Sequence, residues 1–200
     1  MSIWKCRRGS QLEKRRPPVD ARDGKSRQLM VNAAIKIRSL EEPDADALAA
    51  GFAEMGWKKP RSQYVRYLEE QAAGSRAVLV AVWDGSVAGY LTIVWESSEP
   101  VFRAQHIPEI KDFNVLARFR SRGIGSALMD RAEAMIAEKS AVAGLGVGLH
   151  SGYGSAQRLY ARRGYIPDGA GVVIAGESVL EGAEVRLDDA PLLRMTKILR

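Results

Sequence analysis

The sequence predicts a mixed α/β fold in which helices flank a central mixed sheet with mostly antiparallel strands. Short β-branched runs near both ends of the chain are joined by turn residues, which is typical of hairpins. The middle of the chain instead reads as a strand, a helix and a further strand. With 200 residues, 46% of them hydrophobic, the chain is large enough for one domain with a sizeable core.

The first half of this domain combines helices and a hairpin. Apolar residues recur at helical spacing in two segments that end at Gly56 and Gly74. Asp84-Gly85-Ser86 joins two β-branched runs, which indicates a hairpin. We expect a strand at 35–38, helices at 43–55 and 62–73, and strands at 77–83 and 87–95.

The second half alternates strands and helices. One strand carries glycine at every second position, at Gly144, Gly146 and Gly148. Residues 96–108 and 176–191 are expected to be loops. We expect strands at 109–116, 142–149, 172–175 and 192–198, and helices at 125–138 and 155–163.

The net charge of +6 belongs to the N-terminal tail. Residues 1–29 hold nine Lys/Arg and three acidic residues, which leaves 21 of each in residues 30–200. The tail also lacks periodic apolar residues, so we expect a disordered, basic extension before a folded domain at 30–200. A nucleic-acid-binding arm is the alternative, but few aromatic residues accompany the charge and the rest of the chain is neutral.

Composition excludes several other classes of protein. Cys6 is the only cysteine, which excludes a disulfide framework and a thiolate-rich metal site and fits a reducing cytoplasm. No run of 18 apolar residues predicts a membrane-spanning helix, and the charged start of the chain does not resemble a secretion signal. We therefore expect a cytoplasmic protein with no membrane partner and no metal.

The segment between residues 115 and 126 predicts a phosphate-binding turn. It enters from a strand, contains Gly123 and Gly125, and leaves into a helix. Glycines let phosphate oxygens approach the backbone, and the N–H groups and dipole of the helix N-terminus attract the anion. Charge-assisted donors come from three arginines, Arg118, Arg120 and Arg122.

Two other interpretations explain this turn less well. A dinucleotide-binding fingerprint requires a third glycine where Leu128 stands, and an acidic residue where the next strand ends at His150 and Ser151. Glycines that merely close a tight turn would not account for three arginines within five residues.

Two motifs in the expected order resemble the GNAT superfamily of N-acetyltransferases. Arg120, Gly123 and Gly125 match its [Q/R]-x-x-G-x-[G/A] signature after the fourth strand. Residues 156–165 match its A-x-x-L-Y-x-[RK]-x-G-[FY] helix. The order of the elements over residues 35–198 agrees with that family, so the resemblance covers everything except the tail.

The resemblance implies a binding mode for acetyl-CoA, used as a co-substrate. Its pyrophosphate would lie on residues 120–126, with the backbone N–H groups of Arg122, Gly123, Ile124 and Gly125 as the main donors and Ser126 beside them. Its pantetheine arm would pair with Val115, Leu116 and Ala117, where the fourth and fifth strands splay apart. The alternate glycines fit close packing beside that splay and fit equally well tight contacts between sheet and helix.

The resemblance also implies catalytic residues. Tyr160 matches the family tyrosine that protonates the departing CoA thiolate, and its other interpretation is a buried packing residue. A base or a water chain must remove a proton from the alkylammonium acceptor. Glu109 corresponds to a strand-four glutamate that some members use through water, with Asp112 and Glu96 as rivals and an ordinary exposed carboxylate as an equal alternative. A bulge often interrupts this strand in the family, so alternation does not decide between them.

Other polar residues receive weaker assignments. His106 and His150 are interpreted as surface or loop residues. Tyr153 stands where the family commonly has an asparagine that contacts the CoA arm, which puts that contact in doubt.

The sequence therefore predicts an N-acetyltransferase that moves an acetyl group from acetyl-CoA to a primary amine by direct transfer in a ternary complex. The acceptor can be a small molecule or a protein amine, with specificity expected in the two early helices and the loops at 96–108 and 176–191. The alternative is a non-catalytic acyl-CoA-binding regulatory module. Homodimers are frequent in the family, but no feature of this sequence establishes one.

Overall fold

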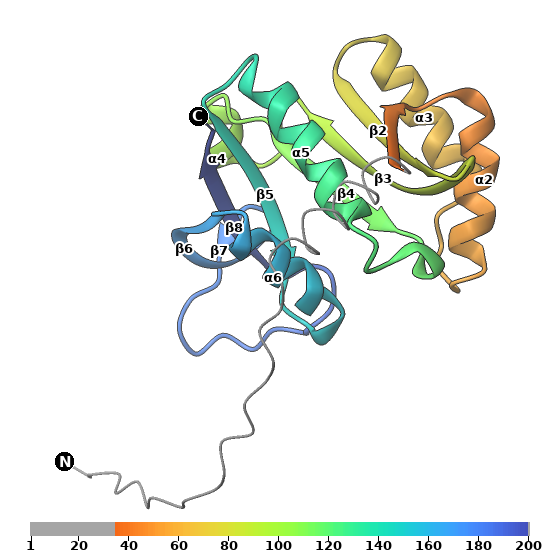
Figure 1. The fold of residues 1–200 in the computed structure, drawn as a ribbon. Helices are drawn as coiled ribbons and strands as arrows, with labels where there is room; N and C mark the ends of the chain where they lie inside the picture. Colours follow the sequence, from red (N-terminus) through yellow and green to blue (C-terminus); the bar gives the residue numbers. More distant parts are fainter. Residues whose placement is uncertain (1–34, 200) are drawn as a thin grey trace, which may run out of the picture.

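The computed structural model describes residues 35–199 (Figure 1). The predicted extension at 1–29 lies outside these residues. The elements are β1 (Ile35–Ser39), α2 (Glu42–Ala53), α3 (Arg61–Ala72), β2 (Arg76–Trp83), β3 (Ser86–Val94), α4 (Pro100–Ala104), β4 (Glu109–Val115), α5 (Ile124–Ala137), β5 (Val142–Gly148), α6 (Gly154–Arg162), β6 (Ile166–Ile174), β7 (Glu177–Ser178) and β8 (Leu192–Ile198). Short 3-10 turns occupy Ala117–Phe119 and Ser151–Tyr153.

One eight-stranded sheet forms the centre of the fold. Its strand order is β1-β2-β3-β4-β5-β8-β6-β7. Neighbouring strands are antiparallel except for β4 and β5, which run parallel. The predicted mixed, mostly antiparallel sheet is therefore confirmed.

The parallel pair β4 and β5 is joined over only a short length. Their register pairs Glu109 with Gly144 and Ile110 with Leu145, but β4 continues to Val115. The two strands therefore part beyond Ile110, which confirms the predicted splay. The free edge of β4 between residues 111 and 115 has backbone groups that β5 does not pair.

A bulge in β4 lies beside the splay. Tyr90 of β3 pairs with Asn114 and Thr92 pairs with Lys111, so Leu91 alone lies opposite Asp112 and its neighbour Phe113. Asp112 has a φ of 47°, in the left-handed region that aspartate tolerates better than most residues. Because a bulge bends its strand and increases the twist, it accounts for β4 turning away from β5.

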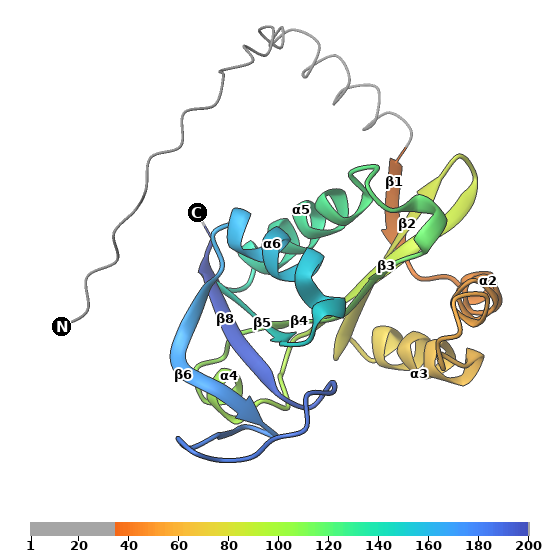
Figure 2. The same cartoon turned by 90° about the horizontal axis from the view of Figure 1, so that it is seen from below.

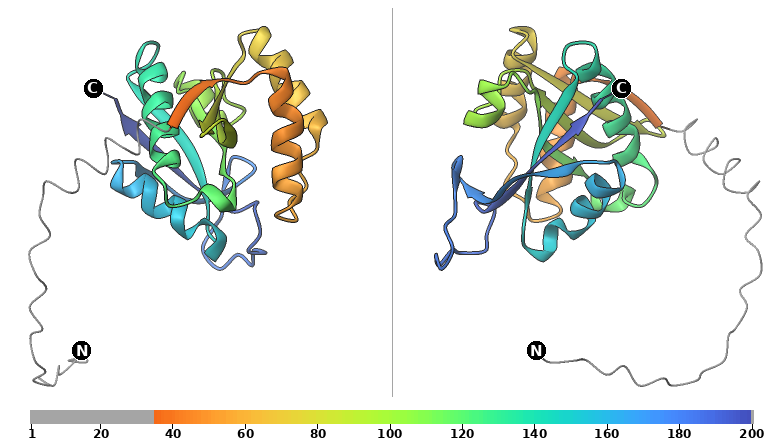
Figure 3. Two further views of the ribbon diagram at one scale, coloured as in Figure 1. Left: turned by 45° about the vertical axis from the view of Figure 1, so that its right-hand side comes forward. Right: turned by 90° about the vertical axis from the view of Figure 1, so that its left-hand side faces the viewer.

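Helices cover both faces of the sheet (Figures 2 and 3). One core joins α5 to the sheet through residues such as Leu128, Met129 and Ile136. A second core joins α2 and α3 to the opposite face, through residues such as Leu48 and Phe52. Across the described part of the chain, no helix is both long and apolar enough to cross a membrane.

Three regions differ from the elements expected from sequence, and one of them is the expected loop at 176–191, which contains the two-residue strand β7. The expected loop at 96–108 contains α4, which starts with Pro100 and buries Phe102 against the backbone of Gly144. The expected strand at 172–175 is longer because β6 already pairs with β8 at Ile166. An irregular stretch interrupts that pairing between Pro167 and Val172, where proline and glycines hide the strand pattern.

Candidate active site

The turn between β4 and α5 presents unpaired backbone donors. Gly123 is the N-cap of α5 with φ 82°, and Ser121 is also left-handed with φ 60°. No side chain caps the helix. The N–H groups of a first helical turn have no partner within the helix, so those of α5 are available to an anion.

The three arginines of the turn differ in what they contact. Arg118 donates to Glu54 at 2.9 Å and is thereby partly neutralised. Arg120 Nε donates to the carbonyl of Val115 at 3.1 Å, and the Arg122 guanidinium lies 5.5 Å from the centre of the Trp83 ring. Neither Arg120 nor Arg122 forms an ion pair with a residue in 35–199. Their charges are therefore free for a ligand.

The remaining predicted cofactor residues lie around this turn. The side chains of Leu116 and Ile124 are buried in the two cores, so only their backbone groups can face a ligand. Ala117 lies in the 3-10 turn, which places the end of the free strand edge at Val115. A Cβ atom at Gly125 would come within 3.1 Å of the Phe113 ring, so α5 lies against β4 here.

Tyr160 of α6 approaches the splay from the α5 side of the sheet. Its ring is 6.4 Å from that of Phe113 and 6.0 Å from that of Tyr165, measured between centroids. The side chain is 6% exposed, and its hydroxyl makes no hydrogen bond to another residue in the described chain. Burial, and to a lesser extent Tyr153, raises the pKa of Tyr160, so the hydroxyl keeps its proton at neutral pH.

Glu109 lies at the closed end of the splay, where β4 and β5 still pair. Its carboxylate is buried, and Oε2 accepts hydrogen bonds from Ser97 at 2.6 Å and from Lys111 at 3.2 Å. Its rival Glu96 is 84% exposed and lies 3.9 Å from Arg103. Glu109 is therefore a buried carboxylate, and the interpretation as an ordinary exposed one does not hold.

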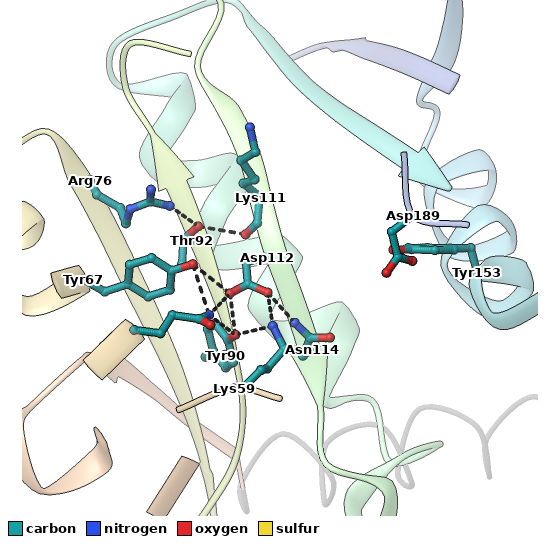
Figure 4. A network of polar contacts seen from close by, with 11 residues as sticks. Lys59, Tyr67, Arg76, Tyr90, Thr92, Lys111, Asp112, Asn114, Tyr153 and Asp189 are labelled. Carbon is teal, nitrogen blue, oxygen red and sulfur yellow. Dashed lines mark hydrogen bonds and ion pairs between the residues drawn. The ribbon is translucent and has the colours of Figure 1, made fainter. Parts of the chain in front are cut away.

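Asp112, the second rival, is the centre of a dense polar network on the α3 side of β4 (Figure 4). Five side-chain groups donate to its carboxylate: Lys59 Nζ (2.5 Å) and Asn114 Nδ2 (2.8 Å) to Oδ1, and Tyr90 OH (2.5 Å), Gln63 Nε2 (2.7 Å) and Tyr67 OH (2.9 Å) to Oδ2. We call these six residues the Asp112 cluster. A carboxylate offers about four lone-pair sites, so Asp112 has no free capacity to accept another hydrogen bond.

The negative charge of Asp112 is also compensated within the cluster. Lys59 is its cation, and the side chains of Lys59 and Asp112 are each 17% exposed. Burial and the Asp112 charge raise the pKa of Tyr67 to about 12. The same two causes raise the pKa of Tyr90, so both phenols remain hydrogen-bond donors.

A smaller group lies at the C-terminal end of β5. The ring of Tyr153 covers Gly148 so closely that a Cβ atom there would be 2.3 Å from it. The Tyr153 hydroxyl donates to Asp189 Oδ1 at 3.0 Å, and His150 Nε2 lies 3.1 Å from the same oxygen. We call His150, Tyr153 and Asp189 the Asp189 triad. It attaches the loop between β7 and β8 to the end of β5.

Sequence reasoning missed most residues of the Asp112 cluster, and it missed Asp189. Four of the five partners of Asp112 come from the α2–α3 connection, α3 and β3, and no local motif links them to Asp112. The fifth, Asn114, belongs to β4 itself. Asp189 lies in a segment without periodicity, so nothing distinguishes it from other loop acids. Within residues 35–199, no three His, Cys, Asp or Glu residues are grouped so as to hold a metal ion.

Several solved structures share the overall fold of this chain. An N-acetyltransferase from Staphylococcus aureus Mu50 is 16% identical with a TM-score of 0.64, covering 83% of this chain and 99% of that one. A ribosomal-protein-alanine N-acetyltransferase from Brucella melitensis is 24% identical with a TM-score of 0.62, covering 82% and 99%. YncA, a putative acetyltransferase from Salmonella typhimurium solved with its cofactor acetyl-CoA, is 18% identical with a TM-score of 0.62, covering 84% and 95%.

These identities establish a shared fold. The sequence matches no curated protein at a significant level. The model of the Acetyltransferase (GNAT) family, however, matches residues 39–165, which include β4, the arginine-rich turn, α5 and the Tyr160 helix. The chain therefore belongs to the GNAT family of acetyltransferases.

Proposed function

We propose that the protein is an N-acetyltransferase that transfers the acetyl group of acetyl-CoA directly to a primary amine in a ternary complex. The observation that carries the proposal is the splay, with unpaired donors at the α5 N-terminus near one end and the Tyr160 side chain beside it. Membership of the GNAT family supports acetyl transfer. The acceptor is a small molecule or a protein amine, and the protein acts in the cytoplasm.

The turn and the free edge of β4 suit acetyl-CoA. Backbone N–H groups at residues 122–125 would hold the pyrophosphate, and Arg120 and Arg122 would add charge to this contact. Gly123 lacks a side chain at the helix cap, and its positive φ aims the chain into α5. The backbone of residues 111–115 would pair with the amides of the pantetheine arm, as an added strand would.

The acyl transfer forms a C–N bond and breaks the C–S bond, so the products are an amide, a CoA thiol and one proton released by the amine. Tyr160 would donate its hydroxyl hydrogen to the sulfur as negative charge develops there, and it would regain a hydrogen from the nitrogen of the intermediate, so that it ends the reaction neutral. Its raised pKa keeps that hydrogen in place over the whole neutral range. The absence of a hydrogen bond to any described residue leaves the hydroxyl free for this contact.

Glu109 is the base that we propose for the amine, acting through water. Its Oε2 is held by Ser97 and Lys111, whereas Oε1 accepts no hydrogen bond from a residue of the described chain. Asp112 is less suitable because five donors already saturate it. Glu109 thus has one carboxylate oxygen without a hydrogen bond from the described chain, whereas both oxygens of Asp112 are hydrogen-bonded.

The test is thiol release from acetyl-CoA across a panel of primary amines, with wild type and two tyrosine variants. We expect Tyr160→Phe to lower turnover by about 10²–10⁴-fold, the usual contribution of general acid catalysis, and to leave acetyl-CoA affinity within a few-fold. Tyr165→Phe is the matched control, because its hydroxyl is buried without a partner and its ring adjoins that of Tyr160.

A pH–rate profile of the Tyr160→Phe variant completes this experiment, since a CoA thiol with a pKa near 8.5 can also leave unprotonated. Wild-type turnover across the profile would make Tyr160 a packing residue. Acetyl-CoA binding without thiol release for any amine would instead support a non-catalytic acyl-CoA-binding module.

A further inference from the structure

Two aspartates border the splay from opposite sides. Asp112 belongs to β4, and Asp189 is attached to the end of β5 through Tyr153. Figure 4 shows the Asp112 cluster on one side of β4 and the Tyr153–Asp189 pair beyond the other side. Under the proposed function an acceptor amine must reach the thioester within this splay, so it approaches both carboxylates.

The two carboxylates differ in what remains available to a ligand. Asp112 is hydrogen-bonded at both oxygens and neutralised by Lys59. Asp189 uses only Oδ1, and Oδ2 has no hydrogen-bond partner among the described residues. Its side chain is 82% exposed. Asp189 therefore presents an open oxygen, whereas Asp112 presents none.

Asp189 is held both in position and in its charged form. The backbone N–H of Gly152 donates to His150 Nδ1 at 3.1 Å, so the His150 hydrogen is on Nε2 and points to Asp189. Hydrogen bonds from His150, then from Tyr153, lower the pKa of Asp189. The carboxylate is therefore anionic at neutral pH.

The two groups also influence each other electrostatically. The Lys59 ammonium contributes to the lowered pKa of Asp189. Burial raises the pKa of Tyr153 to about 12, with further contributions from Asp189 and from Asp112. Of these charges, Asp112 and Lys59 cancel, and the charge of Asp189 remains.

That remaining charge has a consequence for the acceptor. The reacting nitrogen must lose a proton before it attacks, so its ammonium charge is not available to Asp189 in the reactive form of the acceptor. A second cationic group on the acceptor keeps its charge throughout the reaction and complements the charge of Asp189. We propose that Asp189 is a specificity-determining residue that binds a second ammonium group, so the preferred acceptors are primary amines carrying a further positive charge, such as diamines.

The proposal rests on the proposed function and predicts a preference for dications over isosteric monocations. The probes are diamines from 1,3-diaminopropane to 1,6-diaminohexane, each paired with the monoamine in which a methyl group replaces one ammonium group. 1,5-Diaminopentane, for example, is compared with n-hexylamine. The readout is kcat/KM for thiol release from acetyl-CoA.

Two charge-removing variants isolate Asp189. Asp189→Asn keeps an oxygen for Tyr153 and His150 and so keeps the loop attached, but it removes the charge. Asp188→Asn removes a charge from the neighbouring residue, whose carboxylate instead contacts Ala190 N and lies near Arg186. Long-range electrostatics alone would affect both variants alike.

We expect wild type to prefer at least one diamine, and Asp189→Asn to lower that preference by about threefold to fivefold, the upper range for an exposed ion pair. Asp188→Asn should leave the preference unchanged. The proposal is overturned if no diamine is preferred, if Asp189→Asn slows both members of a pair equally, or if Asp188→Asn has the same effect.

A binding measurement separates this proposal from the proposed function. Calorimetry follows the diamines and their monoamine partners as each is added to the full chain saturated with CoA. If no amine releases thiol, the transferase proposal fails, but diamine binding that weakens in Asp189→Asn and not in Asp188→Asn still supports Asp189 as the ammonium site. Equal binding in the three proteins overturns it.

Discussion

The arginine-rich turn follows the end of β4, the Asp112 cluster lies at the middle of β4, and the two use their charges in opposite ways. In the turn, the first N–H groups of α5 are uncapped, and Arg120 and Arg122 have no ion-pair partner in the described chain. In the cluster, one carboxylate receives five hydrogen bonds and a cation. The turn therefore has hydrogen-bond donors and positive charges left for a ligand. In the Asp112 cluster, nearly all hydrogen-bonding groups are already paired within the protein.

The contrast shows that charge alone does not identify a binding site. A charged group whose hydrogen bonds are satisfied within the protein mainly fixes local geometry, because a ligand must first displace its partners. A charged group with unused donors or acceptors gains a partner when the ligand arrives. The turn therefore suits ligand binding and the Asp112 cluster suits positioning of β4.

The largest effect is expected on acetyl-CoA affinity when a carboxylate is placed in the arginine-rich turn. Gly125→Asp should abolish acetyl-CoA binding, because it places a carboxylate in the first turn of α5 where the pyrophosphate is expected. Gly125→Ala is the control, since it adds only a Cβ atom next to Phe113. Calorimetry measures affinity and circular dichroism verifies folding. Unchanged acetyl-CoA affinity in a folded Gly125→Asp protein would refute the role of the turn.

Removing the charge of Asp112 should lower the stability of the protein. Asp112→Asn leaves the Lys59 ammonium without its counter-ion, which we expect to lower the free energy of unfolding by about 3 kcal/mol, the lower end for breaking a buried ion pair. The double variant with Lys59→Met should recover most of this loss. Urea denaturation measures both. A single variant as stable as wild type would contradict a positioning role.

Removing one arginine of the turn should weaken acetyl-CoA binding by an amount that depends on which arginine is removed. Arg120→Ala should weaken acetyl-CoA binding by roughly 1.5–3 kcal/mol, the range for a hydrogen bond to a charged group. Arg118→Ala should cost less, about 0–1 kcal/mol, because Arg118 is exposed and already paired with Glu54. The two affinities, measured by calorimetry at one salt concentration, give the comparison. Equal losses would mean that unpaired charge does not distinguish the two residues.

The smallest effect is expected from the other basic region of the chain. Deleting residues 1–29 removes nine Lys/Arg, yet it should leave melting temperature, acetyl-CoA affinity and turnover close to wild type. The physical reason is that this segment has no periodic apolar residues with which to pack on the domain. A large fall in melting temperature on truncation would show that the segment contributes to the fold.

The fold and the conformation of the arginine-rich turn were predictable because their signals are local. Hairpin turns, helical periodicity and the glycine-containing turn each lie within one short stretch of sequence, and two of these stretches match family motifs in the right order. The splay was predicted from the resemblance, and the register of β4 and β5 confirms it. The bulge in β4, which the family often has, is present at Asp112.

The Asp112 cluster and the Asp189 triad were not predictable because their contacts join distant parts of the chain. Lys59 meets Asp112 from 53 positions away, and Tyr153 meets Asp189 from 36. None of these residues belongs to a motif, and an aspartate in a loop has the same local pattern whether it is solvated or held by two donors. α4 was missed for a related reason, since a five-residue helix is too short to show a period.

In the bulge, Asp112 is an extra residue in β4 relative to the pairing with β3. If this residue is set aside, residues 109–115 alternate regularly: Glu109, Lys111 and Asn114 lie towards α3, and Ile110, Phe113 and Val115 towards α5. β4 would then pair with β3 without interruption, and its bend away from β5 would lose its cause. A chain lacking Asp112 should fold with a longer β4–β5 ladder, visible as slower amide hydrogen exchange in residues 111–115. One residue thus separates a continuous sheet from a sheet with room for a cofactor.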